Sequence, residues 1–142
     1  MNVELWGHAV GIDESRIDAP EAEIREQVAA YVAGERRTFD LPVAVPDDFG
    51  GSVMDAMASI PYGETRTYGD LADELDTAAV AVGQACGANP VPIVVPCHRV
   101  VGADSLGGYS ASGGLELKER LLALEGSVER DATLERFVRP TR

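Results

Sequence analysis

A cysteine, a histidine and an arginine stand side by side at positions 97–99, directly after a proline-rich stretch. Pro92 and Pro96 restrict the backbone, so we expect the sulfur of Cys97 to have a fixed position. A neighbouring imidazole and guanidinium favour the thiolate, which is the nucleophilic form of cysteine. A base and a carboxylate that orients it would complete a nucleophilic site. A small buried cysteine without any chemistry is the alternative.

The remaining cysteine and histidine content excludes several classes of protein. Two cysteines are too few for a disulfide framework, and with only two histidines beside them the sequence argues against a structural zinc site. Cys86 lies within a predicted helix and is interpreted as a small helix residue. The start of the chain lacks the features of a secretory signal, and no apolar run approaches the ~18 residues of a membrane span. We therefore expect a reduced, cytoplasmic protein that does not associate with membranes.

The elements that must position these residues follow from the spacing of apolar side chains. Residues 2–12 predict a strand or a hairpin. A helix is predicted from Pro20 to a stop at Gly34. Alternation of apolar residues over 39–45 predicts a short strand, which Pro42 would confine to the edge of a sheet.

We expect the second part of the chain to be mostly helical. Val53, Met54, Met57 and Ile60 predict one amphipathic helix, which would end at the turn over residues 61–63. Thr67 and Asp70 have the spacing of a capping box at the start of another.

Asp76 or Thr77 is expected to cap a third helix over residues 78–88. Two short helices joined by a tight turn are compatible with a helix-turn-helix, although a merely packed pair is the alternative. The prolines predict an extended, buried, irregular segment over 90–101. A last helix is expected to be capped by Ser112 and to end at Gly126.

The charge of the chain is strongly negative. Its 142 residues contain 12 Lys and Arg against 24 Asp and Glu, a net charge of −12, and Lys118 is the only lysine. Such a composition suits a salt-filled cytoplasm and predicts a haloarchaeal source. A hydrophobic content of 45% excludes wholesale disorder and predicts one compact domain, or two very small ones.

Acidic residues are almost absent around the two cysteines. From residue 77 to residue 115 the only formal charges are Arg99 and Asp104. This stretch is either simply core or a neutral window through which a polyanion or an uncharged substrate can approach.

The segment Pro96-Cys97-His98-Arg99-Val100-Val101 resembles the active-site signature of the O6-alkylguanine-DNA alkyltransferases, also called methylated-DNA–protein-cysteine methyltransferases. Further motifs at matching spacing extend the resemblance over residues 49–126. They are Ile60-Pro61-Tyr62-Gly63-Glu64-Thr65, Thr67-Tyr68-Gly69-Asp70-Leu71-Ala72, Val82-Gly83, Asn89-Pro90-Val91-Pro92-Ile93, Gly108-Tyr109, Ser112-Gly113-Gly114-Leu115, Lys118-Glu119-Arg120-Leu121-Leu122 and Glu125-Gly126. The resemblance implies an α+β fold. A small strand and helix part, residues 1–48, would precede a mostly helical part with a helix-turn-helix, residues 49–142.

The resemblance also implies a function in direct-reversal DNA repair. Such a protein binds duplex DNA, flips an O6-alkylated guanine out of the stack and transfers the alkyl group irreversibly to Cys97. The thioether product has no easy exit, so each molecule would act once. The implied partner is duplex DNA that contains O6-alkylguanine, no cofactor or metal is implied, and we expect a monomer.

Four residues would carry the reaction according to the resemblance. Cys97 would be the alkyl acceptor and His98 its water-mediated base, oriented by Glu125. Tyr68 would help to rotate the nucleotide and protonate the leaving guanine. Ordinary packing of Tyr68, a satisfied polar role of His98 and a solvated position of Glu125 at a helix end are the alternatives.

Other residues would bind the DNA and the flipped guanine. Asn89 would tie the recognition helix to the active-site segment, and Arg99 would anchor the two parts of the chain to each other. The carbonyls of Cys97 and Val100 would accept from the guanine amino group. Tyr109 would form a wall of the alkyl pocket, and Ser112 would meet the O6 region.

Some positions depart from the pattern of the family. Val80 stands where the family usually has an arginine that fills the space of the flipped base, and Phe49-Gly50 replaces the usual Phe-Gln. The recognition helix contains no lysine or arginine. We therefore expect DNA binding to depend on helix N-termini, shape and insertion of the apolar Val80, and to tolerate salt.

The sequence is also compatible with two other functions. Alkyltransferase-like proteins bind alkylated DNA without repairing it, and they typically lack the acceptor cysteine that is present here as Cys97. A small thiol hydrolase that uses Cys97 and His98 would need an oxyanion loop, and none is recognisable in the sequence.

Overall fold

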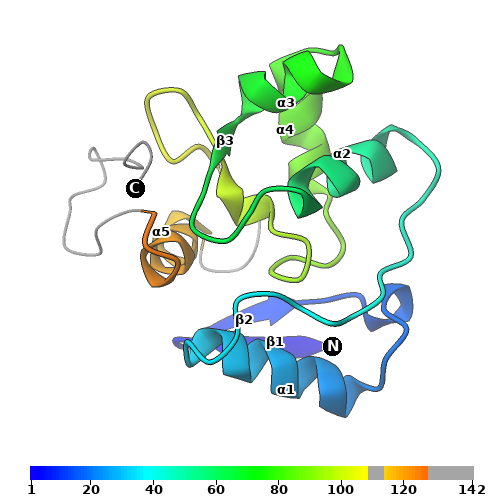
Figure 1. Cartoon of the computed structure of the whole chain (residues 1–142), viewed down its shortest axis with the longest axis vertical. Coiled ribbons are helices and arrows are strands. Elements are labelled where there is room, and N and C mark those ends of the chain that lie inside the picture. Colours follow the sequence, from blue (N-terminus) through cyan, green and yellow to red (C-terminus); the bar gives the residue numbers. More distant parts are fainter. Residues whose placement is uncertain (109–113, 128–142) are drawn as a thin grey trace.

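The computed structural model of the chain describes residues 1–108 and 114–127. The chain begins with the hairpin that the sequence predicts, β1 (Asn2–Leu5) paired antiparallel with β2 (His8–Gly11) (Figure 1). Trp6 and Gly7 connect the strands with φ angles of 50° and 86°. A two-residue hairpin turn needs this left-handed conformation to match the twist of the strands.

Helix α1 (Glu21–Val32) crosses the hairpin and buries one face against it. It follows Pro20 directly, and Gly34 ends it with a φ of 79°, as the sequence predicts. Its buried side chains include Ile24, Val28 and Tyr31.

The strand predicted over residues 39–45 is wrong. Only an isolated antiparallel bridge between Ile17 and Val43 forms there. Pro42 accepts a hydrogen bond from the backbone of Asp18 but has no N–H to return. The opposing chain is the end of a short 3-10 turn, η1 (Glu14–Arg16), so the pairing cannot extend.

The second part of the chain contains the remaining helices. Helix α2 (Phe49–Ala58) is capped by the side chain of Asp48. Helix α3 (Tyr68–Leu75) begins with the predicted capping box, and it packs against α4 (Ala79–Gly87) as the next helix along the chain. This is the arrangement expected of a helix-turn-helix.

The predicted cap of α4 is wrong, because neither Asp76 nor Thr77 occupies that position. Ala78 is the residue before the helix and contributes no side-chain hydrogen bond. Asp76 instead ends α3 in the left-handed conformation, with φ and ψ both at 55°. Aspartate tolerates this conformation better than most residues, so it serves the end of one helix and cannot also begin the next.

A buried, irregular segment follows α4, as the prolines predict. It ends in a 3-10 turn, η2 (Cys97–Arg99), and in strand β4 (Val100–Val101), which pairs in parallel with β3 (Arg66–Thr67). Helix α5 (Gly114–Leu124) lies beside η2 and is followed by Gly126 with a φ of 82°. The expected cap at Ser112 lies outside the described residues.

Helices with small sheets make this an α+β fold, as predicted. Buried apolar residues of the first section (residues 1–48) and the second section (residues 49–142) form one continuous cluster, which includes Leu5, Ile24, Met57 and Ile93. Along residues 1–108 and 114–127, no helix has the length and apolar character needed to cross a bilayer.

Candidate active site

The segment from Asn89 to Val95 forms a closed turn that leads to the cysteine. The side chain of Asn89 donates to the carbonyl of Val95 at 2.9 Å and accepts from the N–H of Val91 at 3.0 Å. Ile93 has a φ of 76°, a strained conformation for a β-branched residue, and it is buried. Asn89 thus joins the end of α4 to the backbone of the segment that carries Cys97.

Cys97, His98 and Arg99 form the 3-10 turn η2, and all three are buried. The N–H of Val100 donates to the carbonyl of Cys97 and closes the turn. Since the segment before the turn is held by Asn89 and the segment after it by strand pairing, the sulfur has a defined position. The sequence predicted this from the prolines.

The carboxylate of Glu125 is the centre of the polar network behind the turn. Its Oε2 lies 2.9 Å from Nε2 of His98, and Arg99 donates through Nε to Oε1 at 2.9 Å and through its Nη2 to Oε2 at 3.0 Å. Glu125 is 6% exposed, so it is not a solvated helix-end residue.

Burial and charge determine the protonation of this network. Burial raises the pKa of Glu125, but hydrogen bonds and charges from His98 and Arg99 outweigh it and lower that pKa to about 2. Burial lowers the pKa of His98 against the opposing effect of Glu125. At neutral pH the site therefore holds a carboxylate and a neutral imidazole.

The neutral imidazole can act as a base towards the cysteine. Its Nε2 donates to Glu125, so the tautomer assigned from the network leaves Nδ1 as an acceptor. Nδ1 of His98 is buried and has no hydrogen-bond partner among the described residues. A group that accepts a proton, directly or through one water, is what a thiol needs to become a nucleophile.

Lys118 also belongs to this site, and its sequence motif by itself does not indicate that role. Its ammonium is fully buried and donates to the carbonyls of Val100 at 2.6 Å and Gly108 at 2.9 Å. Burial lowers its pKa to about 8, and the charge of Cys97 opposes that effect. The carbonyl of Val100, expected to meet guanine, already accepts from Lys118. The sequence did contain a hint of this role. Lys118 is the only lysine of the chain, and it lies four residues before Leu122, a spacing that puts the two residues on the same side of the predicted helix.

Tyr68 begins α3 and is half-buried. Its hydroxyl donates weakly to the carbonyl of Gly108 at 3.5 Å, and the Lys118 ammonium lies 5.7 Å from its ring. Burial raises its pKa, so the phenol is protonated at neutral pH. Tyr109 and Ser112, expected to line the alkyl pocket, lie outside the described residues.

Arg99 is placed differently from the expected anchor between the two sections. Both of its partners, Glu125 and the carbonyl of Ile60 at 2.6 Å, belong to the second section. The link between the sections at this point comes from Tyr31 of α1, whose hydroxyl donates to Glu125 at 2.5 Å. Tyr31 lies within the helix predicted from Pro20 to Gly34, and nothing local in the sequence marks its hydroxyl as paired.

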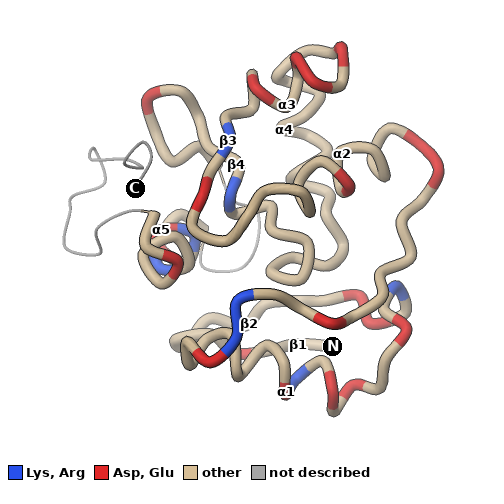
Figure 2. Tube along the Cα trace, viewed as in Figure 1, with Lys and Arg blue, Asp and Glu red and all other residues tan. Residues whose placement is uncertain are grey.

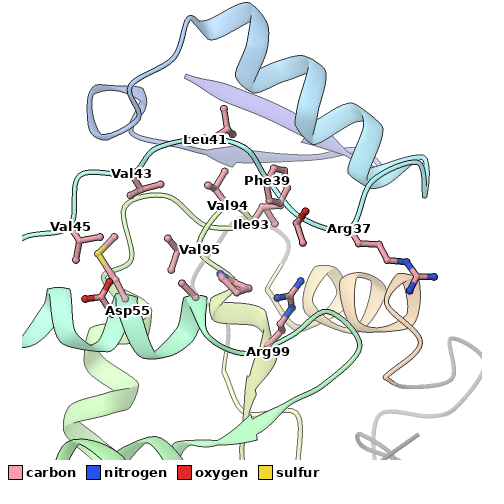
Figure 3. Close-up of a pocket in the computed structure, with 14 residues that line it drawn as sticks. Arg37, Phe39, Leu41, Val43, Val45, Asp55, Ile93, Val94, Val95 and Arg99 are labelled. Carbon is pink, nitrogen blue, oxygen red and sulfur yellow. The ribbon is translucent and has the colours of Figure 1, made fainter.

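A cavity of about 310 Å³ lies between the extended segment 37–45, α2 and the segment before Cys97 (Figure 3). Its walls are mostly apolar, and Figure 3 shows Val43, Val45, Val94 and Val95 around it. Cys97 is not among the residues that line it. The cavity is therefore separate from the reactive sulfur.

The surface of α4 is free of charge. Figure 2 shows α4 without acidic or basic residues, whereas α3 beside it carries several acids. Val80 in the first turn of α4 is 72% exposed, and no side chain caps that helix. Among the described residues, no group of three or more His, Cys, Asp or Glu side chains could hold a metal ion.

Comparison with known proteins places this site in a family. Residues 48–127 match the model of the DNA-binding domain of 6-O-methylguanine DNA methyltransferase. A methylated-DNA–protein-cysteine methyltransferase of Methanosarcina acetivorans is 50% identical over 109 residues, which cover 74% of this chain and 69% of the relative. The corresponding protein of Mycolicibacterium paratuberculosis is 51% identical over 70% of this chain, but the match spans only 62% of its own length.

Two solved structures are similar as well. The crystal structure of Mycobacterium tuberculosis OGT in complex with DNA has a TM-score of 0.69 at 47% identity and covers 75% of this chain and 67% of the other. S. pombe Atl1 in complex with damaged DNA containing O6-carboxymethylguanine has a TM-score of 0.51 at 34% identity, over 59% of this chain and 80% of the other.

Proposed function

The chain belongs to the family of 6-O-methylguanine DNA methyltransferases, and from that premise we propose that it repairs DNA by moving an alkyl group from O6 of guanine to Sγ of Cys97. One observation carries the proposal. Cys97 lies in a buried turn directly before a neutral imidazole, which is itself held by the carboxylate of Glu125. The turn lies within the part of the chain that matches the family.

The reaction balances within this set of residues. The Cys97 thiol passes its proton, through one water, to Nδ1 of His98, and Glu125 stabilises the imidazolium that forms. The thiolate attacks the alkyl carbon, so an S–C bond forms while the C–O6 bond breaks. The electron pair of the broken bond stays with guanine, and Tyr68 donates the proton that the leaving base needs. The proton taken up by His98 then restores the phenol of Tyr68 through water, so both residues return to their neutral forms. The thioether remains on the protein, which acts once.

DNA binding is proposed to use α3 and α4 as a helix-turn-helix. The target atom cannot be reached inside the duplex, so the alkylated guanine must leave the stack. Val80 is exposed at the start of α4 and would enter the space of the flipped base as an apolar wedge. Asn89 would couple movements of α4 to the active-site segment through its hydrogen bonds to Val91 and Val95.

The flipped guanine is proposed to lie against Tyr109, Ser112 and the carbonyl oxygens of Cys97 and Val100. Arg99 would act from behind, since its guanidinium is bound to Glu125 and Ile60. We also propose that residues 1–48 and 49–142 are separate domains, and that the chain works as a cytoplasmic monomer on duplex DNA.

Mass spectrometry tests the reaction directly. The full chain is mixed in high KCl with a duplex that carries one O6-methylguanine, and intact and peptide masses are recorded. We expect a stoichiometric gain of one methylene on the peptide that contains Cys97. The gain should vanish in Cys97→Ala and persist in Cys86→Ala, which removes the other cysteine of the chain.

Other outcomes would overturn the proposal. Binding to the lesion without a mass gain would indicate a damage sensor, the second candidate, which the similarity to S. pombe Atl1 supports. The presence of Cys97 beside His98 argues against that candidate. Steady turnover of a small ester would instead indicate a thiol hydrolase.

A further inference from the structure

Tyr31 connects the first section of the chain to the carboxylate of the proposed active site. Its hydroxyl donates to Oε2 of Glu125 at 2.5 Å and lies 3.5 Å from Nε2 of His98. The donor and acceptor are 94 residues apart in the sequence. The same Oε2 also accepts a hydrogen bond from Nε2 of His98 at 2.9 Å, so Tyr31 and His98 are bound to one carboxylate oxygen.

The surroundings of Tyr31 hold its ring in place. Its side chain is completely buried, with the ring of Phe39 at 5.4 Å and the ring of Tyr62 edge-on at 6.2 Å. Burial and the charge of Glu125 raise the pKa of Tyr31 above its ordinary value. The hydroxyl therefore keeps its proton throughout the working pH range and acts only as a donor to the carboxylate.

We infer that Tyr31 is a positioning residue of the alkyl-transfer site, which fixes Oε2 of Glu125 and limits how strongly that oxygen holds a proton on His98. The inference rests on the proposed function, because it assigns Tyr31 a part in the same reaction. It also gives the first section a role in the chemistry, through one side chain of α1.

The direction of the effect follows from the geometry. Because the O–H bond of Tyr31 points at Oε2, its positive end lies closer to Nε2 of His98 than its oxygen does. The partial positive charge on the hydroxyl hydrogen disfavours the imidazolium form of His98. The same hydrogen bond draws negative charge from the carboxylate of Glu125, which would otherwise stabilise that imidazolium. Tyr31 thus helps to keep His98 neutral, with Nδ1 ready to accept a proton.

The other charged and titratable groups around His98 act in both directions. Burial lowers its pKa most, Glu125 raises it, and Arg99 in the same turn and Lys118 on α5 lower it. Cys97 is the adjacent residue in the same turn. None of these groups changes in a Tyr31→Phe variant, so the variant isolates the hydroxyl.

The first measurement is the pKa of His98 by NMR in the free protein. Only His8 and His98 contribute imidazole signals, and His8 pairs with Glu116 at 3.7 Å, so it serves as an internal reference. We expect the pKa of His98 to rise in Tyr31→Phe and to stay unchanged in Tyr62→Phe. Tyr62 is the matched control, since it touches the same ring cluster but donates to the backbone carbonyl of Leu124.

The second measurement is the rate of alkyl transfer in single turnover as a function of pH. The acid limb should move to higher pH in Tyr31→Phe and remain in place in Tyr62→Phe. A tenfold gain in proton affinity would lower the rate at the wild-type midpoint by about fivefold. Replacement of Tyr31 by 3-fluorotyrosine, a stronger donor that keeps the ring and hydroxyl, should move the limb to lower pH.

The outcomes separate the two proposals. An unmoved His98 pKa in both Tyr31 variants, or an equal shift in Tyr62→Phe, would overturn the role of Tyr31 even if the wild type transfers alkyl groups. If Tyr31→Phe does not fold, the fluorotyrosine variant decides alone. A wild type without transfer would overturn the proposed function, whereas the NMR result would still report the hydrogen bond.

Discussion

At the scale of single residues, the site depends on one carboxylate that four hydrogen bonds saturate. Glu125 accepts from His98, Tyr31 and, twice, Arg99. A buried charge is tolerated only when such partners replace the lost water. The carboxylate of Glu125 also orients His98, so the stability of the fold and the proposed reactivity depend on the same group.

Replacement of Glu125 by Gln should change the pH dependence of folding. The folded pKa of Glu125 is lowered to about 2 from an ordinary value of 4.5, so its ionised form stabilises the fold above about pH 4.5. That stabilisation is lost as the pH falls from 4.5 towards 2. We expect the difference in unfolding free energy between wild type and Glu125→Gln to be constant above this window and to shrink within it.

Urea unfolding at pH 7, 4.5, 3 and 2 measures that difference. Glu64→Gln is the control, because Glu64 pairs with Arg66 at the surface and should show little of this dependence. A difference between wild type and Glu125→Gln that does not change with pH would contradict the assignment.

At the scale of elements, α3 and α4 begin in different ways. Thr67 and Asp70 satisfy the first N–H groups of α3 reciprocally, at 2.9 Å in each direction. Helix α4 begins at Ala79, directly after Ala78, with no side-chain cap and no acidic residue in its first turn. In the proposed complex with DNA, the positive N-terminal end of α4 would be open to the phosphates.

Thr67→Ala should destabilise the protein by about 1 kcal/mol, since it removes the side-chain cap of α3. Thr77→Ala is the matched control, because Thr77 caps neither helix, and its effect should stay within about 0.5 kcal/mol. Thermal or urea unfolding gives both values. Equal losses in the two variants would mean that the capping box contributes nothing in solution.

Val80→Arg should increase the affinity for duplex DNA several-fold in dilute salt. One added cation at the interface should also make binding more sensitive to salt. The slope of log K against the logarithm of the salt concentration should become steeper by roughly one. Val80→Gln adds a polar side chain without a charge and should leave the slope unchanged. Fluorescence anisotropy with a labelled duplex measures both quantities, and identical slopes in Arg and Gln variants would place Val80 outside the interface.

At the scale of the whole molecule, a net charge of −12 must approach a polyanion. Acids are exposed on α3 and on the first section, whereas α4 and the active-site segment are nearly free of them (Figure 2). A protein that neutralises few phosphates releases few counterions on binding. Electrostatic attraction therefore contributes little to the affinity for DNA, and added salt should weaken binding only slightly.

The wild-type affinity for a lesion duplex should therefore fall by less than about tenfold between 50 and 200 mM KCl. A lesion-free duplex in the same titration serves as the control and should bind more weakly at every salt concentration. A loss of a thousandfold over this range would show that phosphate contacts dominate after all.

Much of this protein was determined by its sequence alone. The hairpin, α1, α2 and the capping box of α3 were predicted because each depends on residues a few positions apart. The active-site motif around Cys97 was found in the same way, and the family resemblance supplied His98, Glu125 and Tyr68 as candidates. Within the neutral stretch, residues 95–101 are core, as one of the two alternatives expects, and the start of α4 is exposed. An approach of DNA at that exposed end stays a prediction.

Only the tertiary structure decided which groups meet across the chain. It placed Tyr31 on Glu125, turned Arg99 towards partners in its own section and buried Lys118 against the carbonyl of Val100. It also left residues 39–45 without a strand partner. The physical reason is the same in each case: a local pattern reports how a residue relates to its neighbours, whereas the partner of a buried polar group is chosen by packing of distant segments.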